Sequence, residues 1–199
     1  MKVFSVSLLG TAAVAAALLS GCATSITVDN QVQAFSSLTA TPAQATYKFD
    51  RLPSMQEPGQ AQVEAMADAA LHRAGLRRDD AAARYTVQVS GRVQRVVSPW
   101  ADPWDGGMWG GFGWGHRRGG RFGVSMGMES PWYHREVAVI VREVGSAKVV
   151  FESHSAHDGP WMDNTMVFPA MFEAALQGFP QPPAGPRRVD ITIAPVASK

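Results

Sequence analysis

The chain has 199 residues, 46% of them hydrophobic, which is enough for one domain with an apolar core. It carries 18 lysines and arginines against 17 aspartates and glutamates, and this near-neutral balance argues against a general nucleic-acid binder. A single cysteine excludes an internal disulfide, so we expect stability to come from packing.

The first 21 residues have the pattern of an export signal. Lys2 gives a positive start, and residues 3–18 form an uncharged apolar run, shorter than the roughly 20 residues of a membrane span. Leu19-Ser20-Gly21-Cys22 follows at once. This ending resembles the lipobox of bacterial lipoproteins, in which the cysteine is acylated with diacylglycerol and the signal is removed before it. We therefore expect a signal peptide at 1–21 and a lipid anchor on Cys22; the alternative is an ordinary signal that happens to end near a cysteine.

Ala23 occupies the position after that cysteine. An alanine there, in place of aspartate, resembles the pattern of lipoproteins exported to the outer membrane in enterobacteria. The expected location is the periplasmic face of the outer membrane.

The anchored part begins with two short strands. In residues 24–35, Ile26 and Val28 alternate with polar neighbours, as in a half-buried strand. Residues 45–49 form the second, with Tyr47 and Phe49 on one face. Residues 36–44 and 51–58 contain prolines and are predicted to be connections.

Two amphipathic helices are predicted. The first covers residues 59–74 and ends at Gly75, with Gln60, Gln62, Glu64 and Asp68 on its polar side. The second covers residues 164–178, with Pro169 near the first turn, where proline is tolerated. Their apolar stripes, at spacings of three and four, are Val63, Met66, Ala67, Ala70, Leu71 and Ala74, and Val167, Phe168, Met171, Phe172, Ala175, Leu176 and Phe179.

Four more strands are predicted, with a charged connector at 77–83. In residues 84–97, Gly91 interrupts an apolar face and indicates a bulge or close packing. Residues 132–144 are apolar on both faces, which is typical of a central strand, and 148–154 return after the tight turn at Gly145-Ser146. Residues 157–163 are predicted to be a loop, and residues 187–194 a last strand.

Between the strands 84–97 and 132–144 lies an unusual segment, residues 98–131. It holds ten of the 19 glycines and four of the six tryptophans. Glycine at this density disfavours regular structure, so we predict a long, partly disordered hairpin loop. We expect it to meet lipid head groups, a glycan or an envelope protein through Trp100, Trp104, Trp109, Trp114, Arg117 and Arg118. The alternative is that these tryptophans fold back over the sheet or sit in the membrane interface.

Together these elements predict an α+β fold, a two-layer sandwich. It would have a mostly antiparallel sheet of about six strands, two helices on one face, and the long Gly/Trp-rich hairpin loop. The single domain would span 22–195. The residues expected in its core are Val63, Met66, Leu71, Val87, Val89, Val139, Val141, Phe168, Phe172 and Leu176.

This pattern resembles the bacterial lipoproteins of the domain-of-unknown-function 4136 family over most of the anchored chain. The similar segments are Ile26-Thr27-Val28-Asp29, Ala45-Thr46-Tyr47-Lys48-Phe49, the helix ending at Gly75, Tyr85-Thr86-Val87-Gln88-Val89, the Trp109-Gly110-Gly111-Phe112-Gly113-Trp114 run, the strand pair after it and Phe179-Pro180. The resemblance implies a fold and a place in the envelope, but no activity and no catalytic residues. The chain departs from it at Ala81-Ala82-Ala83-Arg84 and in its extra last strand.

Catalytic chemistry finds little support in the sequence. No Gly-x-Ser-x-Gly, phosphate-loop or His-Glu-x-x-His pattern is present among residues 1–199, and a lipidated cysteine is no nucleophile. His154, His157 and Asp158 could hold a metal in a metal-assisted periplasmic hydrolase only if the chain turned after His154, because residues three apart on a strand point to opposite faces. Solvated loop histidines are the simpler interpretation. We therefore expect no enzyme, metal or cofactor, but a lipid-anchored interaction module of the cell envelope.

Overall fold

The computed structural model describes residues 25–42, 45–100, 131–160 and 162–193. The chain divides into two compact units, one made of 1–27 with 192–199 and the other of Val28–Ile191. In the first unit the described residues are 25–27 and 192–193, at the ends of two strands. No helix in the described ranges is long and apolar enough to cross a membrane.

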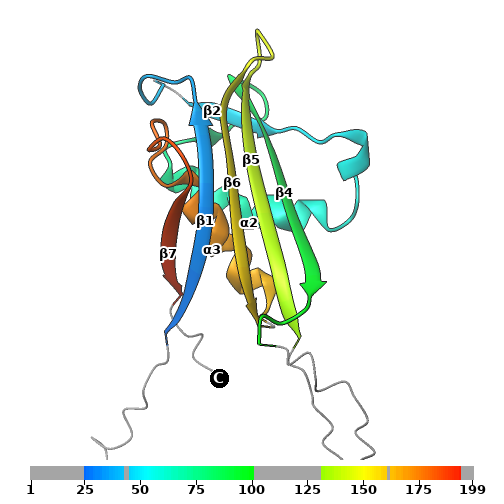
Figure 1. Ribbon diagram of the computed structural model, residues 1–199. Helices are drawn as coiled ribbons and strands as arrows, with labels where there is room; N and C mark the ends of the chain where they lie inside the picture. Colours follow the sequence, from blue (N-terminus) through cyan, green and yellow to red (C-terminus); the bar gives the residue numbers. More distant parts are fainter. Residues whose placement is uncertain (1–24, 43–44, 101–130, 161, 194–199) are drawn as a thin grey trace, which may run out of the picture. The chain divides into compact units, whose positions relative to one another are not determined.

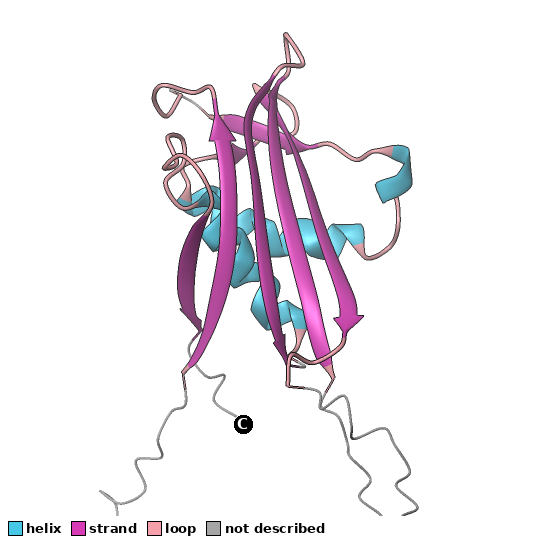
Figure 2. Cartoon of the chain, in the orientation of Figure 1, coloured by secondary structure: helices cyan, strands magenta, loops and turns pink. Residues whose placement is uncertain are grey.

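The second unit is built on a seven-stranded sheet with two helices against one face (Figures 1 and 2). The sheet order is β3-β2-β4-β5-β6-β1-β7. The strands are β1 (Ile26–Ser36), β2 (Thr46–Phe49), β3 (Arg77–Arg78), β4 (Tyr85–Val96), β5 (Trp132–Glu143), β6 (Val149–Pro160) and β7 (Arg187–Ile193). The helices are the single turn η1 (Pro53–Met55), α2 (Gln60–Arg73) and α3 (Asn164–Leu176).

The α+β class and the two helices on one face are confirmed, but the sheet is mixed. β4, β5, β6 and β1 pair antiparallel in turn, whereas β2 runs parallel to both β3 and β4. Parallel neighbours need a crossover, and α2 with its flanking turns provides it between β2 and β4. The predicted connector 77–83 contains β3, and the extra strand β7 lies at the sheet edge beside β1.

β6 is longer than the sequence pattern predicts. It continues through the segment predicted as a loop and pairs with β5 as far as Trp132↔Pro160. The aliphatic alternation that marks a strand stops at His154, but small or polar residues at 155, 157 and 159 continue the covered face. The partner strand β5 supplies the hydrogen bonds that hold this second half in place.

β5 is the central strand, as its two apolar faces predicted. It pairs with β4 without interruption from Tyr85↔Glu143 to Val96↔Trp132. The close packing predicted at Gly91 is confirmed, because a Cβ there would lie 2.8 Å from the Phe168 ring of α3.

The core lies between this sheet and the helices, and eight of the ten expected core residues are buried. Val63 and Met66 are only half-buried, and Pro169 lies in the sixth position of α3, beyond the first turn. The buried face of α2 is rotated about the helix axis relative to the predicted apolar stripe, so that Glu64 faces inward. Arg51 Nε and Nη2 donate to the two Glu64 carboxylate oxygens at 2.6 and 2.7 Å, and this pairing accommodates the buried charge.

Candidate functional site

One row of paired residues divides the four long strands into two halves. Gln31, Ala156, Glu136 and Arg92 lie side by side across β1, β6, β5 and β4. Residues 98–131 are called the Gly/Trp segment from here on. On the side of the row where β4 ends and β5 begins, before and after this segment in the chain, are residues 28–30, 157–160, 132–135 and 93–96. We call this part the loop end; the opposite part, which contains the Gly145-Ser146 turn, is the turn end.

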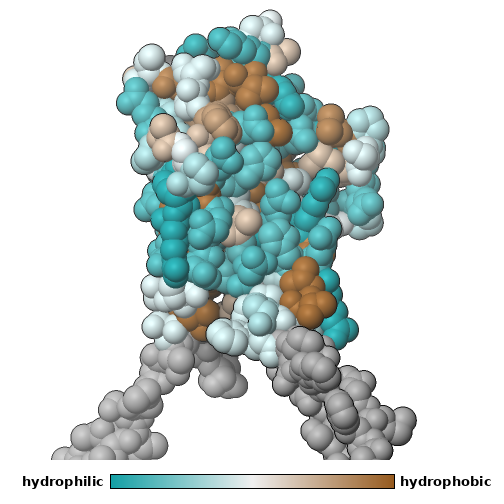
Figure 3. Space-filling view, in the orientation of Figure 1, coloured by the Kyte–Doolittle hydropathy of each residue, from teal (hydrophilic) through white to brown (hydrophobic). Residues whose placement is uncertain are grey.

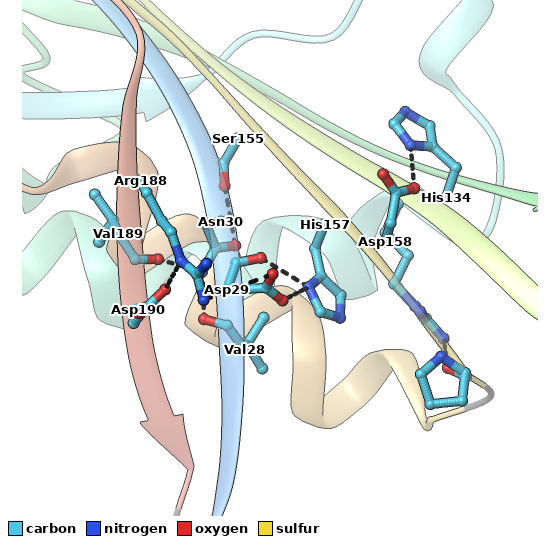
Figure 4. A network of polar contacts seen from close by, with 12 residues as sticks. Val28, Asp29, Asn30, His134, Ser155, His157, Asp158, Arg188, Val189 and Asp190 are labelled. Atoms are coloured by element: carbon cyan, nitrogen blue, oxygen red, sulfur yellow. Dashed lines mark hydrogen bonds and ion pairs between the residues drawn. The ribbon is translucent and has the colours of Figure 1, made fainter. Parts of the chain in front are cut away.

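At the loop end, buried polar side chains connect three strands (Figure 4). The buried His157 of β6 has Nδ1 at 2.8 Å from the Asp29 carbonyl oxygen and 3.0 Å from its Oδ1. The buried amide of Asn30 donates to the carbonyls of Val28 and Val189, at 2.9 and 3.1 Å, and accepts from the Ser155 hydroxyl at 3.1 Å. These contacts hold β1 between β6 and β7. Because a carbonyl can only accept, Nδ1 of His157 carries the proton.

Arg135 lies directly opposite His157 on β5 and is fully buried. Its Nε donates to Oδ1 of Asn164 at 3.1 Å, and its Nη2 donates to the Met162 carbonyl at 3.2 Å. The guanidinium also stands 5.4 Å from the centre of the Tyr133 ring. Burial lowers the pKa of Arg135 from its ordinary value. The side chain therefore joins β5 to the start of α3 and acts as a structural group.

The open face of the sheet, which points away from the helices, is mostly hydrophilic (Figure 3). His134 Nδ1 lies 2.7 Å from Asp158 Oδ1, and His154 Nε2 lies 2.9 Å from Glu152 Oε1. His154 Nδ1 is also 3.7 Å from a Glu136 carboxylate oxygen.

The alternative metal set is not brought together. His154 and Asp158 are on the open face of β6, whereas His157 is buried on the covered face, because β6 runs straight where a turn would have been required. The interpretation of His157 as a solvated loop residue is likewise wrong. Within the described ranges, no group of three or more His, Cys, Asp or Glu residues could hold a metal ion.

A hollow of about 500 Å³ lies between η1, the start of α2 and β4. Its walls include Met55, Val63, Gln88 and Gly91, with Glu57 and Arg92 as the charged residues. Glu57 comes from the connection between η1 and α2, and Arg92 comes from β4. Its described walls contain one carboxylate, one guanidinium and no histidine or cysteine, and so bring together no serine–histidine or cysteine–histidine pair.

Of the predicted binding residues, Trp100 is described and is 84% exposed just after β4. Trp104, Trp109, Trp114, Arg117, Arg118 and the lipidation residue Cys22 lie outside the described residues. Sequence reasoning missed Asn30 and Arg135, although their positions gave a signal. Asn30 and Arg135 each lie two residues from a buried valine, Val28 and Val137, and so point to the same face of their strand. A polar side chain on that face must find buried hydrogen-bonding partners.

The chain belongs to the family described as Domain of unknown function (DUF4136), whose model matches residues 31–181. No curated protein is similar enough to the chain to count as a match.

Similar solved structures include the following two. One is the PelC dodecamer from Paraburkholderia phytofirmans, at 14% identity and a TM-score of 0.45, with 74% of this chain and 94% of that chain covered. The other is a PDZ domain protein from Parabacteroides distasonis, at 9% identity and a TM-score of 0.49, with 94% of this chain and 43% of that chain covered. With both TM-scores below 0.5, neither likeness bears on function.

Proposed function

We propose that the protein is a non-enzymatic lipoprotein, anchored through Cys22 at the periplasmic face of the outer membrane. There it acts as an interaction or accessory module of the cell envelope. The Leu19-Ser20-Gly21-Cys22 ending of the apolar signal supports the anchor. The position of His154 and His157 on opposite faces of β6 argues against the alternative metal set of His154, His157 and Asp158.

The observation that carries the proposal is the shared location of two chain segments. β1 and β5 are both antiparallel to β6, so they run in the same direction and both begin at the loop end (Figure 1). Val28 of β1 is six residues after Cys22, and six residues of extended chain span at most roughly 20 Å. The start of β5 follows the Gly/Trp segment. A lipid on Cys22 would therefore keep this segment close to the membrane.

That proximity defines the partners we propose for the Gly/Trp segment: lipid head groups, an envelope glycan or an envelope protein. Tryptophan has a large apolar face with one polar N–H, which suits interfaces and sugar faces. Arginine forms paired hydrogen bonds with phosphate or carboxylate. Trp104, Trp109, Trp114, Arg117 and Arg118 provide both kinds of group in a short stretch.

The lipid anchor is tested by replacing Cys22, the residue that we expect to be acylated. Cells producing the full chain or its Cys22→Ser variant are given labelled palmitate, and the protein is followed in membrane fractions on a density gradient. We expect the native chain to carry label and to sediment with outer membrane, because two or more acyl chains give stable anchoring. Cys22→Ser should be unlabelled and either unprocessed or soluble.

A matched control returns the thiol to a nearby position. In Cys22→Ser with Ser25→Cys, a cysteine is present but no longer follows the Leu-Ser-Gly ending. It should remain unlabelled if the lipobox directs acylation. Normal processing and membrane recovery of Cys22→Ser would refute the anchor.

A further inference from the structure

We infer that the loop end rests directly on an anionic lipid bilayer through an apolar strip made of Val93, Val96, Val97 and Trp100. The inference deepens the proposed function and rests on it, because the bilayer is the one that holds the Cys22 lipid. It assigns a membrane-contacting surface to the end of β4 and to the residues that follow it as far as Trp100, the first tryptophan of the segment 98–131.

The strip begins where the helices stop covering β4. β4 is buried at alternate residues up to Val89, and a Cβ at Gly91 would lie 2.8 Å from the Phe168 ring of α3. From Arg92 onward every residue of β4 is exposed, on both faces of the strand. Val97 and Trp100 continue beyond the strand and are 77% and 84% exposed. Val93 and Val96 are three residues apart and point to opposite faces of β4, so the strip follows the end of the strand and includes both of its faces. Exposed aliphatic and aromatic side chains concentrated on one short stretch indicate an interaction surface.

The composition of the strip favours a lipid surface over a protein groove. Valines can enter the outer acyl region, and the indole of Trp100 suits the level of the head groups. Arg92 and Arg95 are exposed on the same stretch and can pair with lipid phosphates. Two acidic residues lie near the strip, and each has a basic neighbour. The Asp158 carboxylate contacts His134, and Glu136 lies opposite Arg92 in the row that separates the two ends of the sheet.

The tether determines which end of the sheet can reach the bilayer. Val28 is at the loop end, at most roughly 20 Å of extended chain from Cys22. β5 has 12 residues, so the turn end is roughly 40 Å away along the strand. The turn end also has exposed valines, Val144 and Val149, which serve as internal controls. Hydrophobic surface at the loop end can be seen in Figure 3.

The first experiment uses the full chain in its membrane. A single cysteine is introduced as Val97→Cys or, at the turn end, as Val149→Cys, and is labelled with a polarity-sensitive fluorophore. The unchanged chain measures any labelling at Cys22. Nitroxide-bearing lipids then quench fluorophores that touch the bilayer. We expect quenching to be several-fold stronger at position 97 than at position 149.

The outcomes separate the possible occupants of the strip. Equal quenching at the two positions would overturn the inference. A blue-shifted but unquenched fluorophore at 97 would overturn it as well, and would show that residues 101–130 or a second copy cover the strip. If the chain is absent from membranes, the anchor fails, and the strip is then decided by the second experiment.

The second experiment needs no anchor. Residues 22–199 with Cys22→Ser are sedimented with vesicles of phosphatidylcholine, with or without phosphatidylglycerol, after circular dichroism has verified the fold. Arg92→Gln or Arg95→Gln should each weaken binding to the anionic vesicles roughly fivefold and leave binding to neutral ones unchanged. Val97→Ser with Trp100→Ser should reduce binding to both kinds. The inference fails if this pair has no more effect than Val144→Ser with Val149→Ser.

Discussion

Gly91 shows at the scale of one residue how α3 is set against the sheet. Its missing side chain leaves the space that the Phe168 ring occupies, 2.8 Å from where a Cβ would stand. Gly91→Ala should therefore lower the free energy of unfolding by roughly 1–3 kcal/mol through overpacking, as urea denaturation can measure. Gly145→Ala is the control, because no atom lies within 4 Å of that Cβ position. Equal stability of the two variants would contradict the close approach.

Asp163 caps the start of α3. Its carboxylate accepts from the Thr165 backbone N–H at 2.9 Å, and this bond, together with the Thr165 hydroxyl, lowers the pKa of Asp163 below its ordinary value. A carboxylate with a lowered folded-state pKa contributes stability above the unfolded-state pKa of about 3.9 and loses it as the pH falls through the folded-state value.

Asp163→Ala should therefore lower the melting temperature at neutral pH, and the difference from the native chain should shrink below about pH 4. Asp163→Asn keeps a capping oxygen that does not titrate, so its melting temperature should stay near the native one at neutral pH. A difference for Asp163→Ala that persists unchanged at low pH would contradict a role for the charge.

At the scale of the element, the two helices bury different kinds of face. α3 is buried at eight of its 13 residues, whereas α2 is buried at four, one of which is Glu64. Small residues such as Ala67 and Ala70 let α2 approach its neighbours closely. The rotation of α2 that buries Glu64 is stabilised by Arg51, which comes from the preceding connection.

Leu71→Asp and Phe172→Asp place an unpaired charge in the core, one on each helix. Each should cost several kcal/mol, enough to unfold a domain whose total stability is about 5–15 kcal/mol. Ala69→Asp provides the control on the exposed side of α2 and should melt near the native temperature. An unchanged melting temperature for Leu71→Asp or Phe172→Asp would mean that the buried face of its helix is assigned wrongly.

At the scale of the whole molecule, the β4–β5 ladder is continuous among described residues. Its last described pair is Val96↔Trp132. Replacing residues 103–128 by a short Gly-Ser turn should therefore preserve the circular dichroism spectrum and the melting temperature, and should abolish capture of any envelope partner that the intact chain crosslinks. A matched variant keeps the length and changes only Trp104, Trp109 and Trp114 to serine; it should lose the partner equally. If the shortened chain fails to fold, the segment belongs to the core.

Patterns with many repeats could be predicted from the sequence. The alternation in β4 and β5, the stripe of α3 and the glycine contact at position 91 each follow from several neighbouring residues that share one environment. The second half of β6 could not be predicted, because Ser155, His157 and Gly159 are not strand-like by type. They are held in a strand by pairing with β5, which is distant in sequence.

The open face and the loop end show the same difference between features that could be predicted from the sequence and features that could not. Exposed polar residues on a strand can be predicted from parity, but parity does not say which side chains from different strands will meet. Arg135 and His157 lie opposite each other only because the register is Trp132↔Pro160, and Asn30 is satisfied only because β7 lies beside β1. These buried polar groups depend on partners that are far away in the chain.

The sequence by itself determined the α+β class, the two helices, the central position of β5 and the expectation of a lipid on Cys22, because each depends on residues that are close together in the chain. The tertiary structure alone decided the parallel pairing of β2, the rotation of α2 that buries Glu64, the separation of His154 from His157, and the fact that β1 and β5 both begin at the loop end. These depend on strand order and register, which result from the packing of the whole sheet against its helices and are not encoded in any one segment.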